Sequence, residues 1–197
     1  VGAGISGIMA AKTAAKNGFK TLLVDEKPYL GGSTIYQNSE HFKINNQISS
    51  SWLDKEINEI KKIKKLEIKT RTSVAAYHGY NFLLARENLT DHLPLEQRKD
   101  KTRQRLLKIR ANKVITATGS LERPLIFDNN DRPGIILSSA IEKYANFYGV
   151  ACGEKNVLFT NNDSAYETAI SLYQKGINIE AVIDNREEID SKLIKET

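Results

Sequence analysis

The sequence predicts an α/β fold in which parallel strands are joined by helices, and two observations support this prediction. The order strand, turn, helix, strand occurs twice, at 1–25 and at 156–184. Each second strand ends at an aspartate, which is Asp25 in the first copy and Asp184 in the second. Parallel strands joined in this way need helices on both faces of their sheet, so we expect a three-layer arrangement.

The first copy opens with a Gly-x-Gly-x-x-Gly turn made by Gly2, Gly4 and Gly7. Gly2 permits the tight turn, Gly4 lets a pyrophosphate approach the backbone, and Gly7 lets the helix pack closely on the strand. The helix N-terminus then directs free N–H groups at the phosphates. Asp25 can accept hydrogen bonds from an adenosine ribose, which favours a cofactor without a 2′-phosphate. These residues therefore predict an FAD/NAD(P)-binding Rossmann-like domain.

The segments that follow extend this domain. A turn at 27–33 carries two successive glycines, of which Gly32 can bring backbone N–H groups against the phosphate and ribose of a dinucleotide. Apolar residues at helical spacing predict a helix at 52–65, and alternating apolar and polar residues predict a strand at 66–74.

An antiparallel ribbon is expected next. Its two arms are predicted at 75–87 and 103–110, and together they form a small insertion over about 75–112. The apolar segment 113–117 predicts a further strand, which ends at Thr118-Gly119. These two residues are included among the candidate cofactor contacts.

A cluster of turn-forming residues at 128–134 predicts a domain boundary, because the strand and helix pattern starts afresh after it. We therefore expect a first dinucleotide-binding domain at 1–133 and the beginning of a second Rossmann-like domain at 134–197.

The second unit is predicted to contain a strand at 156–160, a helix at 164–175 and a strand at 179–183. Its turn lacks the glycines of the first copy. Asn162 stands where a Cβ would obstruct a pyrophosphate, and Ala165 stands where the third glycine is expected. This degenerate unit is expected to be structural or to bind something else.

Composition limits the classes of function. The chain has 197 residues, 40% of them apolar, and a net charge of +5. The excess positive charge lies mainly at 61–71 and 98–113, and the first stretch places most of its lysines on the solvated side of a predicted helix. No apolar run approaches the ~20 residues that a bilayer-spanning helix needs. We therefore expect neither nucleic-acid nor membrane partners.

The cysteine and histidine content disfavours disulfide and metal chemistry. The single Cys152 cannot form an internal disulfide, which fits the cytoplasm, and it excludes disulfide reductases, which need a redox-active cysteine pair. Cys152 is interpreted as an inert residue in a turn. His41, His78 and His92 are scattered without the spacing of metal ligands. No metal site and no catalytic residue is predicted.

Only Val1 precedes the glycine turn, although the first strand of a Rossmann unit needs several apolar residues. We therefore expect this chain to be a fragment of a longer polypeptide, and no targeting segment can be judged from it.

The chain resembles the α subunits of heterotetrameric sarcosine oxidases, within the wider group of flavoproteins that have two dinucleotide-binding domains. The resemblance rests on V-D-E-K-P-Y-L-G-G-S at 24–33, A-T-G-S-L-E-R-P-L-I-F-D-N-N-D-R-P-G at 117–134, Y-A-N-F-Y-G-V-A at 144–151 and T-N-N-D-S-A-Y at 160–166. The ribbon segment at 79–93 is also similar to this family.

The resemblance implies an oxidoreductase that converts sarcosine to glycine with oxygen and releases hydrogen peroxide. Tetrahydrofolate captures the one-carbon unit as methylenetetrahydrofolate. In that family the α subunit holds NAD at its first glycine motif, where related flavoproteins hold FAD, and this NAD is not the redox centre. FAD and the substrate site are on the β subunit and FMN lies between α and β. The implied partners are β, γ and δ subunits in the cytoplasm.

The resemblance also implies contacts with NAD at matching positions. These are Ser6, Asp25, Glu26, Lys27 and Ser33, with the backbone near Val74 against the adenine. None of them is a catalytic acid, base or nucleophile. The complete set of predicted cofactor contacts is Gly2, Gly4, Ser6, Gly7, Asp25, Glu26, Lys27, Gly32, Ser33, Val74, Thr118 and Gly119.

Two alternatives remain open at this point. The glycine motif and the acid suit FAD as well as NAD, so the chain could belong to an FAD-binding subunit of an opine oxidase or an amino-acid dehydrogenase. It could also be a non-catalytic assembly module whose nucleotide is only structural, since the sequence offers few catalytic groups.

Overall fold

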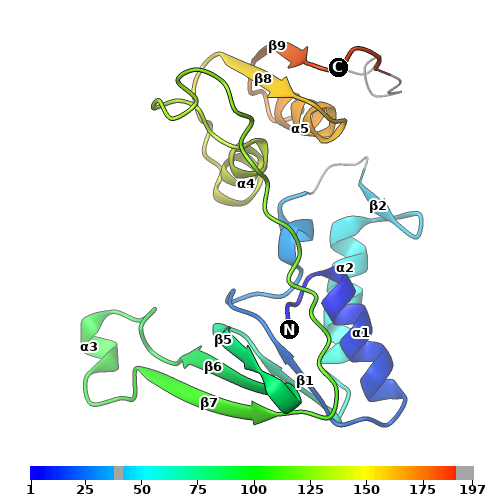
Figure 1. Cartoon of the computed structure of the whole chain (residues 1–197), viewed down its shortest axis with the longest axis vertical. Coiled ribbons are helices and arrows are strands. Elements are labelled where there is room, and N and C mark those ends of the chain that lie inside the picture. Colours follow the sequence, from blue (N-terminus) through cyan, green and yellow to red (C-terminus); the bar gives the residue numbers. More distant parts are fainter. Residues whose placement is uncertain (38–41, 190–197) are drawn as a thin grey trace. The chain divides into compact units, whose positions relative to one another are not determined.

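The computed structural model describes residues 1–37 and 42–189, and contacts divide the chain into two compact units (Figure 1). Unit 1 is Val1–Thr34 with Ile44–Gly119, and unit 2 is Ile35–Lys43 with Ser120–Thr197. The predicted domain boundary between residues 133 and 134 stays a prediction.

Unit 1 contains the first predicted repeat. Helix α1 (Ile5–Lys16) follows the glycine turn and buries a face of small side chains that includes Ala11 and Ala15. Strand β1 (Thr21–Val24) pairs in parallel with β4 (Leu66–Lys69). Small side chains on α1 let the helix lie close to the strands, so its N-terminus is held next to their carboxyl ends.

The helix predicted at 52–65 is α2 (Ser49–Ile60), which lies beside α1 (Figure 1). Lys12 of α1 forms ion pairs with Glu56 and Glu59 of α2. Hydrogen bonds to these two carboxylates raise the pKa of Lys12. The ion pairs link the two helices along the side of the unit.

The predicted ribbon is a three-stranded antiparallel sheet in the order β5 (Thr72–His78), β6 (Phe82–Asn88) and β7 (Gln104–Arg110). The prediction of one continuous arm at 75–87 is therefore wrong. The chain reverses at Tyr80 and Asn81, whose φ angles of 58° and 53° are left-handed. Asparagine tolerates a left-handed conformation better than most residues, so Asn81 is the one residue of this turn whose type indicates a chain reversal.

Two other predicted strands differ from the structure. The strand expected at 66–74 is divided into β4 and β5, because Arg71 has a φ of 51° and turns the chain between them. The segment 113–117 is not a regular strand. Its Ala117 N–H donates to the Val1 carbonyl at 2.7 Å, and pairing with this one residue is too short to form a ladder.

Several short elements complete unit 1 and the segment that joins it to unit 2. They are η1 (Gly32–Ile35), β2 (Lys43–Ile44), β3 (Gln47–Ile48), η2 (Gly79–Asn81) and α3 (Leu95–Arg98).

Unit 2 contains α4 (Ser138–Tyr148) and the second predicted repeat, which is β8 (Asn156–Thr160), α5 (Ser164–Tyr173) and β9 (Ile179–Asp184). Strands β8 and β9 are parallel. The predicted helix ends two residues earlier than expected, before Gly176 with its left-handed φ of 75°. The repeat confirms the predicted α/β class.

In unit 2 one cluster of buried apolar side chains is formed by Ile141, Leu172 and Ile177. Cys152 is partly buried and packs against this cluster, together with Ala145. The interpretation of Cys152 as an inert residue stays a prediction.

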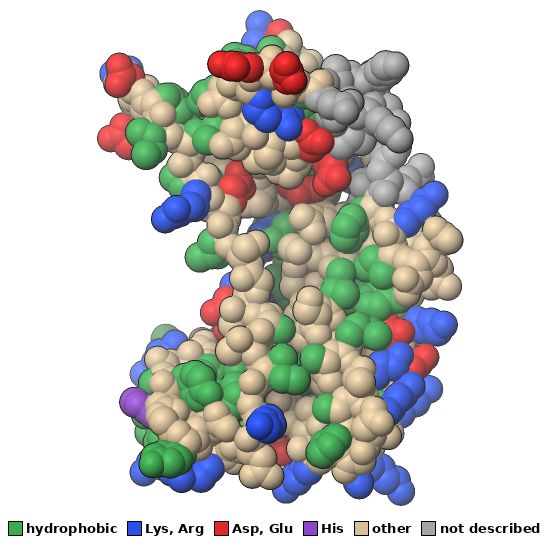
Figure 2. Space-filling model, turned by 45° about the vertical axis from the view of Figure 1, so that its right-hand side comes forward, with side chains coloured by type: hydrophobic (Ala, Val, Ile, Leu, Met, Phe, Trp, Pro, Cys, Tyr) green, Lys and Arg blue, Asp and Glu red, His purple; other side chains and the backbone are tan. Residues whose placement is uncertain are grey.

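Lys and Arg side chains are spread along the margin of unit 1 with carboxylates between them, as Figure 2 shows for one face. Dispersed charges of both signs are typical of a solvated surface. Among the helices that the structure describes, none is both long enough and apolar enough to cross a bilayer.

Candidate dinucleotide-binding site

The glycine turn is built around two positions that only glycine can occupy. Gly2 has a φ of 94°, and a Cβ added there would lie 2.2 Å from the Ala117 carbonyl oxygen. A Cβ on Gly7 would lie 1.8 Å from the Gly2 carbonyl oxygen. Both glycines are therefore required by the fold itself, as the sequence predicted for a tight turn and a closely packed helix.

Gly4 differs from these two glycines. Its φ of −69° and ψ of −176° are open to any residue, and it precedes the first turn of α1, in which no acidic side chain lies. A Cβ on Gly4 would meet only the Gly32 Cα atom, at an ordinary contact distance of 4.0 Å. The fold therefore has room for a side chain at position 4, and this room is where a pyrophosphate was predicted.

The two-glycine loop forms the opposite wall of this space. Gly32 has a φ of 59°, and a Cβ there would come within 2.9 Å of the Gly4 Cα atom. The Gly31 N–H donates to the Ala3 carbonyl at 2.7 Å, so the loop is fixed to the glycine turn. The predicted contacts Ser6 and Ser33 are exposed on the first turn of α1 and on this loop.

Asp25 follows β1 and turns its carboxylate toward the glycine turn. Its Oδ2 accepts the Ala3 N–H at 2.6 Å, and its Oδ1 accepts the Lys27 N–H at 2.8 Å. Each oxygen keeps a lone pair for a further donor. The structure therefore places the predicted acid beside the predicted phosphate site.

Glu26 and Lys27 form an exposed ion pair, with Lys27 Nζ 2.9 Å from Glu26 Oε1. The hydrogen bond to Glu26 raises the pKa of Lys27, although partial burial opposes this effect. Both side chains reach solvent next to Asp25, with exposed fractions of 62% and 48%.

The remaining predicted contacts lie on two neighbouring segments of unit 1. Val74 is half-buried on β5, where the pairing with β6 shifts register between Val74 and Ala76. Thr118 lies near the glycine turn, since its Cα would be 3.2 Å from a Cβ on Gly2. Gly119 has a left-handed φ of 76° in open space.

The corresponding edge of the second repeat is filled by the chain's own side chains. Arg186 Nη2 lies 2.7 Å from Asp163 Oδ1 and 2.6 Å from Asp184 Oδ2. Tyr166 donates its hydroxyl to Asp184 Oδ2 at 3.1 Å. Hydrogen bonds from Arg186 lower the pKa of Asp184 to about 2. Sequence reasoning missed this cluster, for which the only local signal is an arginine two residues after the strand-end aspartate.

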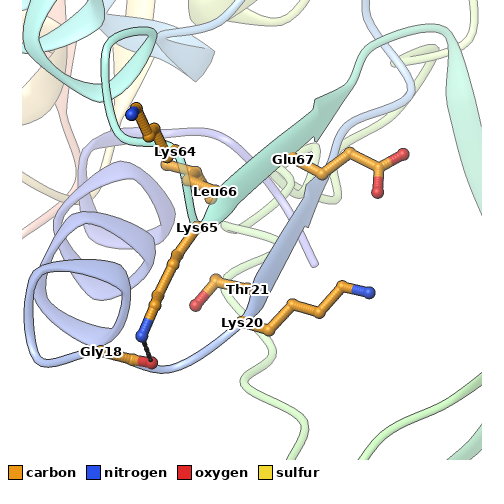
Figure 3. Close-up of a pocket in the computed structure, with 7 residues that line it drawn as sticks. All are labelled: Gly18, Lys20, Thr21, Lys64, Lys65, Leu66 and Glu67. Atoms are coloured by element: carbon orange, nitrogen blue, oxygen red, sulfur yellow. Dashed lines mark hydrogen bonds between the residues drawn. The ribbon is translucent and has the colours of Figure 1, made fainter.

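A shallow pocket lies at the other end of β1 and β4 (Figure 3). Lys20, Lys64 and Lys65 contribute to its lining, and Lys65 Nζ donates to the Gly18 carbonyl at 2.8 Å. Ligands of parallel sheets bind at the carboxyl ends of the strands. This pocket is at the amino ends, so it is separate from the glycine turn.

Within residues 1–37 and 42–189, no three His, Cys, Asp or Glu side chains are arranged to hold a metal ion. His41, one of the histidines considered in the sequence, lies outside the described residues.

Comparisons with known proteins identify similar chains and one family. The family model described as "FAD dependent oxidoreductase" matches residues 1–120. The chain is 39% identical, over 94% of its length, to sarcosine oxidase subunit alpha of Corynebacterium sp. (strain P-1). It is 36% identical, over 97% of its length, to sarcosine oxidase subunit alpha of Corynebacterium sp. (strain U-96). It spans only about a fifth of these relatives, 19% and 20% of their lengths.

A solved structure of L-proline dehydrogenase from P. horikoshii is also similar. It superposes with a TM-score of 0.71 at 25% identity and covers 97% of this chain and 36% of that chain. The predicted resemblance to sarcosine oxidase α subunits and the predicted Rossmann-like fold are confirmed by these matches. Since the family model covers more than half of the chain, including the whole glycine turn, this protein belongs to the FAD dependent oxidoreductase family.

Proposed function

We propose that the glycine turn binds the pyrophosphate of an adenine dinucleotide, with NAD preferred to FAD. The observation that carries this proposal is the room beside Gly4, which lies between the first turn of α1 and the two-glycine loop. Free N–H groups at a helix N-terminus attract phosphate, and a glycine lets the phosphate come close. No contact with the rest of the chain requires a glycine at this position.

The residues proposed to contact the dinucleotide are those expected from the sequence. They are Gly2, Gly4, Ser6, Gly7, Asp25, Glu26, Lys27, Gly32, Ser33, Val74, Thr118 and Gly119. The carboxylate of Asp25 beside the turn favours NAD over NADP, because it would repel a 2′-phosphate.

We further propose that the complete polypeptide acts as the α subunit of a sarcosine oxidase. The two Corynebacterium relatives support this assignment, and this chain corresponds to about a fifth of their length. The reaction would be the oxidative demethylation of sarcosine to glycine with oxygen, with tetrahydrofolate accepting the one-carbon unit. The cytoplasm is the proposed location.

In this assignment the chain supplies binding and not chemistry. Flavins accept the electrons of the amine, and we place FAD and FMN mainly on or with a β subunit, with γ and δ subunits completing the enzyme. None of the proposed contact residues is placed as a general acid, base or nucleophile. The fragment alone is therefore expected to be inactive.

A second candidate is an FAD-binding subunit of an amino-acid dehydrogenase, which the likeness to L-proline dehydrogenase favours. The two candidates differ in the nucleotide at the first glycine turn. Bound flavin absorbs visible light and NAD does not, so the absorbance spectrum of the purified complete subunit without its partners separates them.

The binding proposal is tested with Gly4→Ala in the complete subunit. Because the fold has room for this methyl group and alanine is only a weaker N-cap of α1 than glycine, we expect the unfolding temperature to fall by no more than about 2–4 °C. The methyl group occupies the phosphate site, so NAD affinity should fall by about tenfold or more. Gly79→Ala is the matched control, since it adds the same group in open space away from the turn. Unchanged affinity for both NAD and FAD in Gly4→Ala would refute the proposal.

A further inference from the structure

The Asp25 carboxylate holds two separate segments of the chain at once. One oxygen accepts the Ala3 N–H of the glycine turn and the other accepts the Lys27 N–H of the following turn, at 2.6 and 2.8 Å. Ala3 is completely buried, and Asp25 is the acceptor that its N–H group has in the folded chain.

Ala3 is also the point at which the two walls of the phosphate site meet. Its N–H is bound by Asp25 and its carbonyl accepts the Gly31 N–H at 2.7 Å. Gly31 precedes Gly32, which packs against Gly4. One buried residue, Ala3, therefore connects the Asp25 carboxylate to both the glycine turn and the two-glycine loop.

The second repeat shows the same use of its strand-end acid. Asp184 Oδ1 accepts the Arg186 N–H at 3.0 Å, as Asp25 accepts the Lys27 N–H, two residues further along in both cases. Asp184 then binds Tyr166 of its own helix α5. The acid at the end of the second strand can therefore link parts of its own repeat, even where the turn lacks the glycines of a phosphate site.

We propose that Asp25 is a positioning residue, whose carboxylate holds Ala3 and thereby sets the shape of the phosphate site before any nucleotide binds. This inference rests on the proposed dinucleotide site and assigns Asp25 a role apart from contact with the ribose. A residue that only recognises the ribose would act on the bound nucleotide and leave the empty site unchanged.

The empty site is tested by hydrogen exchange of the complete subunit, freed of nucleotide. In Asp25→Ala, exchange in the segments 1–8 and 30–34 should become about tenfold faster, because the Ala3 and Gly31 N–H groups lose their fixed geometry. Asp25→Asn should restore part of the protection, since its one amide oxygen can still accept the Ala3 N–H. Glu67→Gln, on β4 of the same sheet, is the control and should leave both segments unchanged. Unchanged exchange in Asp25→Ala would overturn the proposal.

Nucleotide recognition is tested with ADP and 2′-deoxy-ADP, because both NAD and FAD contain ADP. We expect Asp25→Ala to weaken 2′-deoxy-ADP about tenfold, because this ligand has no 2′-hydroxyl for Asp25 to bind, and to weaken ADP at least as much. If only ADP weakened and the preference disappeared, Asp25 would be a ribose contact and the positioning role would be wrong. If the wild type bound neither ADP, NAD nor FAD, the proposed site would fail, while hydrogen exchange would still decide the role of Asp25.

Discussion

Glu142 is a buried carboxylic acid whose replacement by glutamine should make unit 2 more stable at alkaline pH. Its side chain lies on α4, and the residue is only 7% exposed. Burial is the main cause that raises its pKa to about 7, and the negative charges of Glu167 and Glu122 add to this effect. A hydrogen bond from Ser171 on α5 opposes it.

The size of the effect follows from the difference between this pKa and the ordinary value of 4.5. At 1.36 kcal/mol per pKa unit, the difference corresponds to about 3 kcal/mol. Between pH 4.5 and pH 7 the folded state binds more protons than the unfolded state, so stability falls as the pH rises through this window. The loss is complete at about pH 8, and above that pH the contribution of Glu142 no longer changes.

The assay is thermal unfolding of the chain and of Glu142→Gln between pH 4.5 and pH 8. Since 1 kcal/mol shifts the unfolding temperature of a chain of this size by about 2–4 °C, the variant should exceed the wild type by about 6–12 °C at pH 8. The two should converge near pH 4.5. Glu154→Gln, at an exposed position of the same unit, should follow the wild-type profile. Parallel profiles for Glu142→Gln and the wild type would refute the reasoning.

Three further predictions concern the proposed function. Asp25→Ala should weaken NAD binding to the complete subunit by about 1–3 kcal/mol in calorimetry, because the buried Ala3 N–H loses its charged acceptor. If the wild type bound NADP as tightly as NAD or more tightly, the proposed NAD site would be wrong. Crystals soaked with NADH should show no pyrophosphate over residues 160–165, where Asn162 and Ala165 replace glycines and Arg186 pairs with the local acids; such density would contradict this. The complete subunit should release peroxide from sarcosine only when it is co-expressed with a β partner. Activity of the single subunit would disprove the proposal that this chain supplies binding and not chemistry.

The regular elements could be predicted because their signals are local. Both strand–helix–strand repeats follow from apolar periodicity with a glycine after the helix, and β8 begins and ends at the predicted residues. The hairpin at Tyr80 and Asn81 was missed because apolar and aromatic residues continue on both sides of it. The division at Arg71 has no such signal, since arginine rarely adopts a left-handed conformation.

The site could be predicted only as a set of residue types. Three glycines in a motif look equivalent in a sequence, yet Gly2 and Gly7 are fixed by contacts with the chain and Gly4 is not. The bond between Asp25 and Ala3 joins residues on different elements, and so does the pairing of Arg186 with Asp163. Such partners depend on how the strands and the helix are placed in space, which the spacing of residues along the chain does not specify.

Because the fold leaves room beside Gly4, the residue at this position in other members of the family indicates whether they bind a nucleotide. A substitution at Gly2 or Gly7 forces backbone atoms apart, so it is selected against whether or not a nucleotide is bound. A substitution at Gly4 meets no such obstacle, so a bound ligand is the main factor that opposes it. A protein that keeps the outer two glycines and has a larger residue between them is therefore expected to have kept its architecture and lost its cofactor. The residue type at the position of Gly4 therefore distinguishes relatives that share only the fold from relatives that also bind the nucleotide.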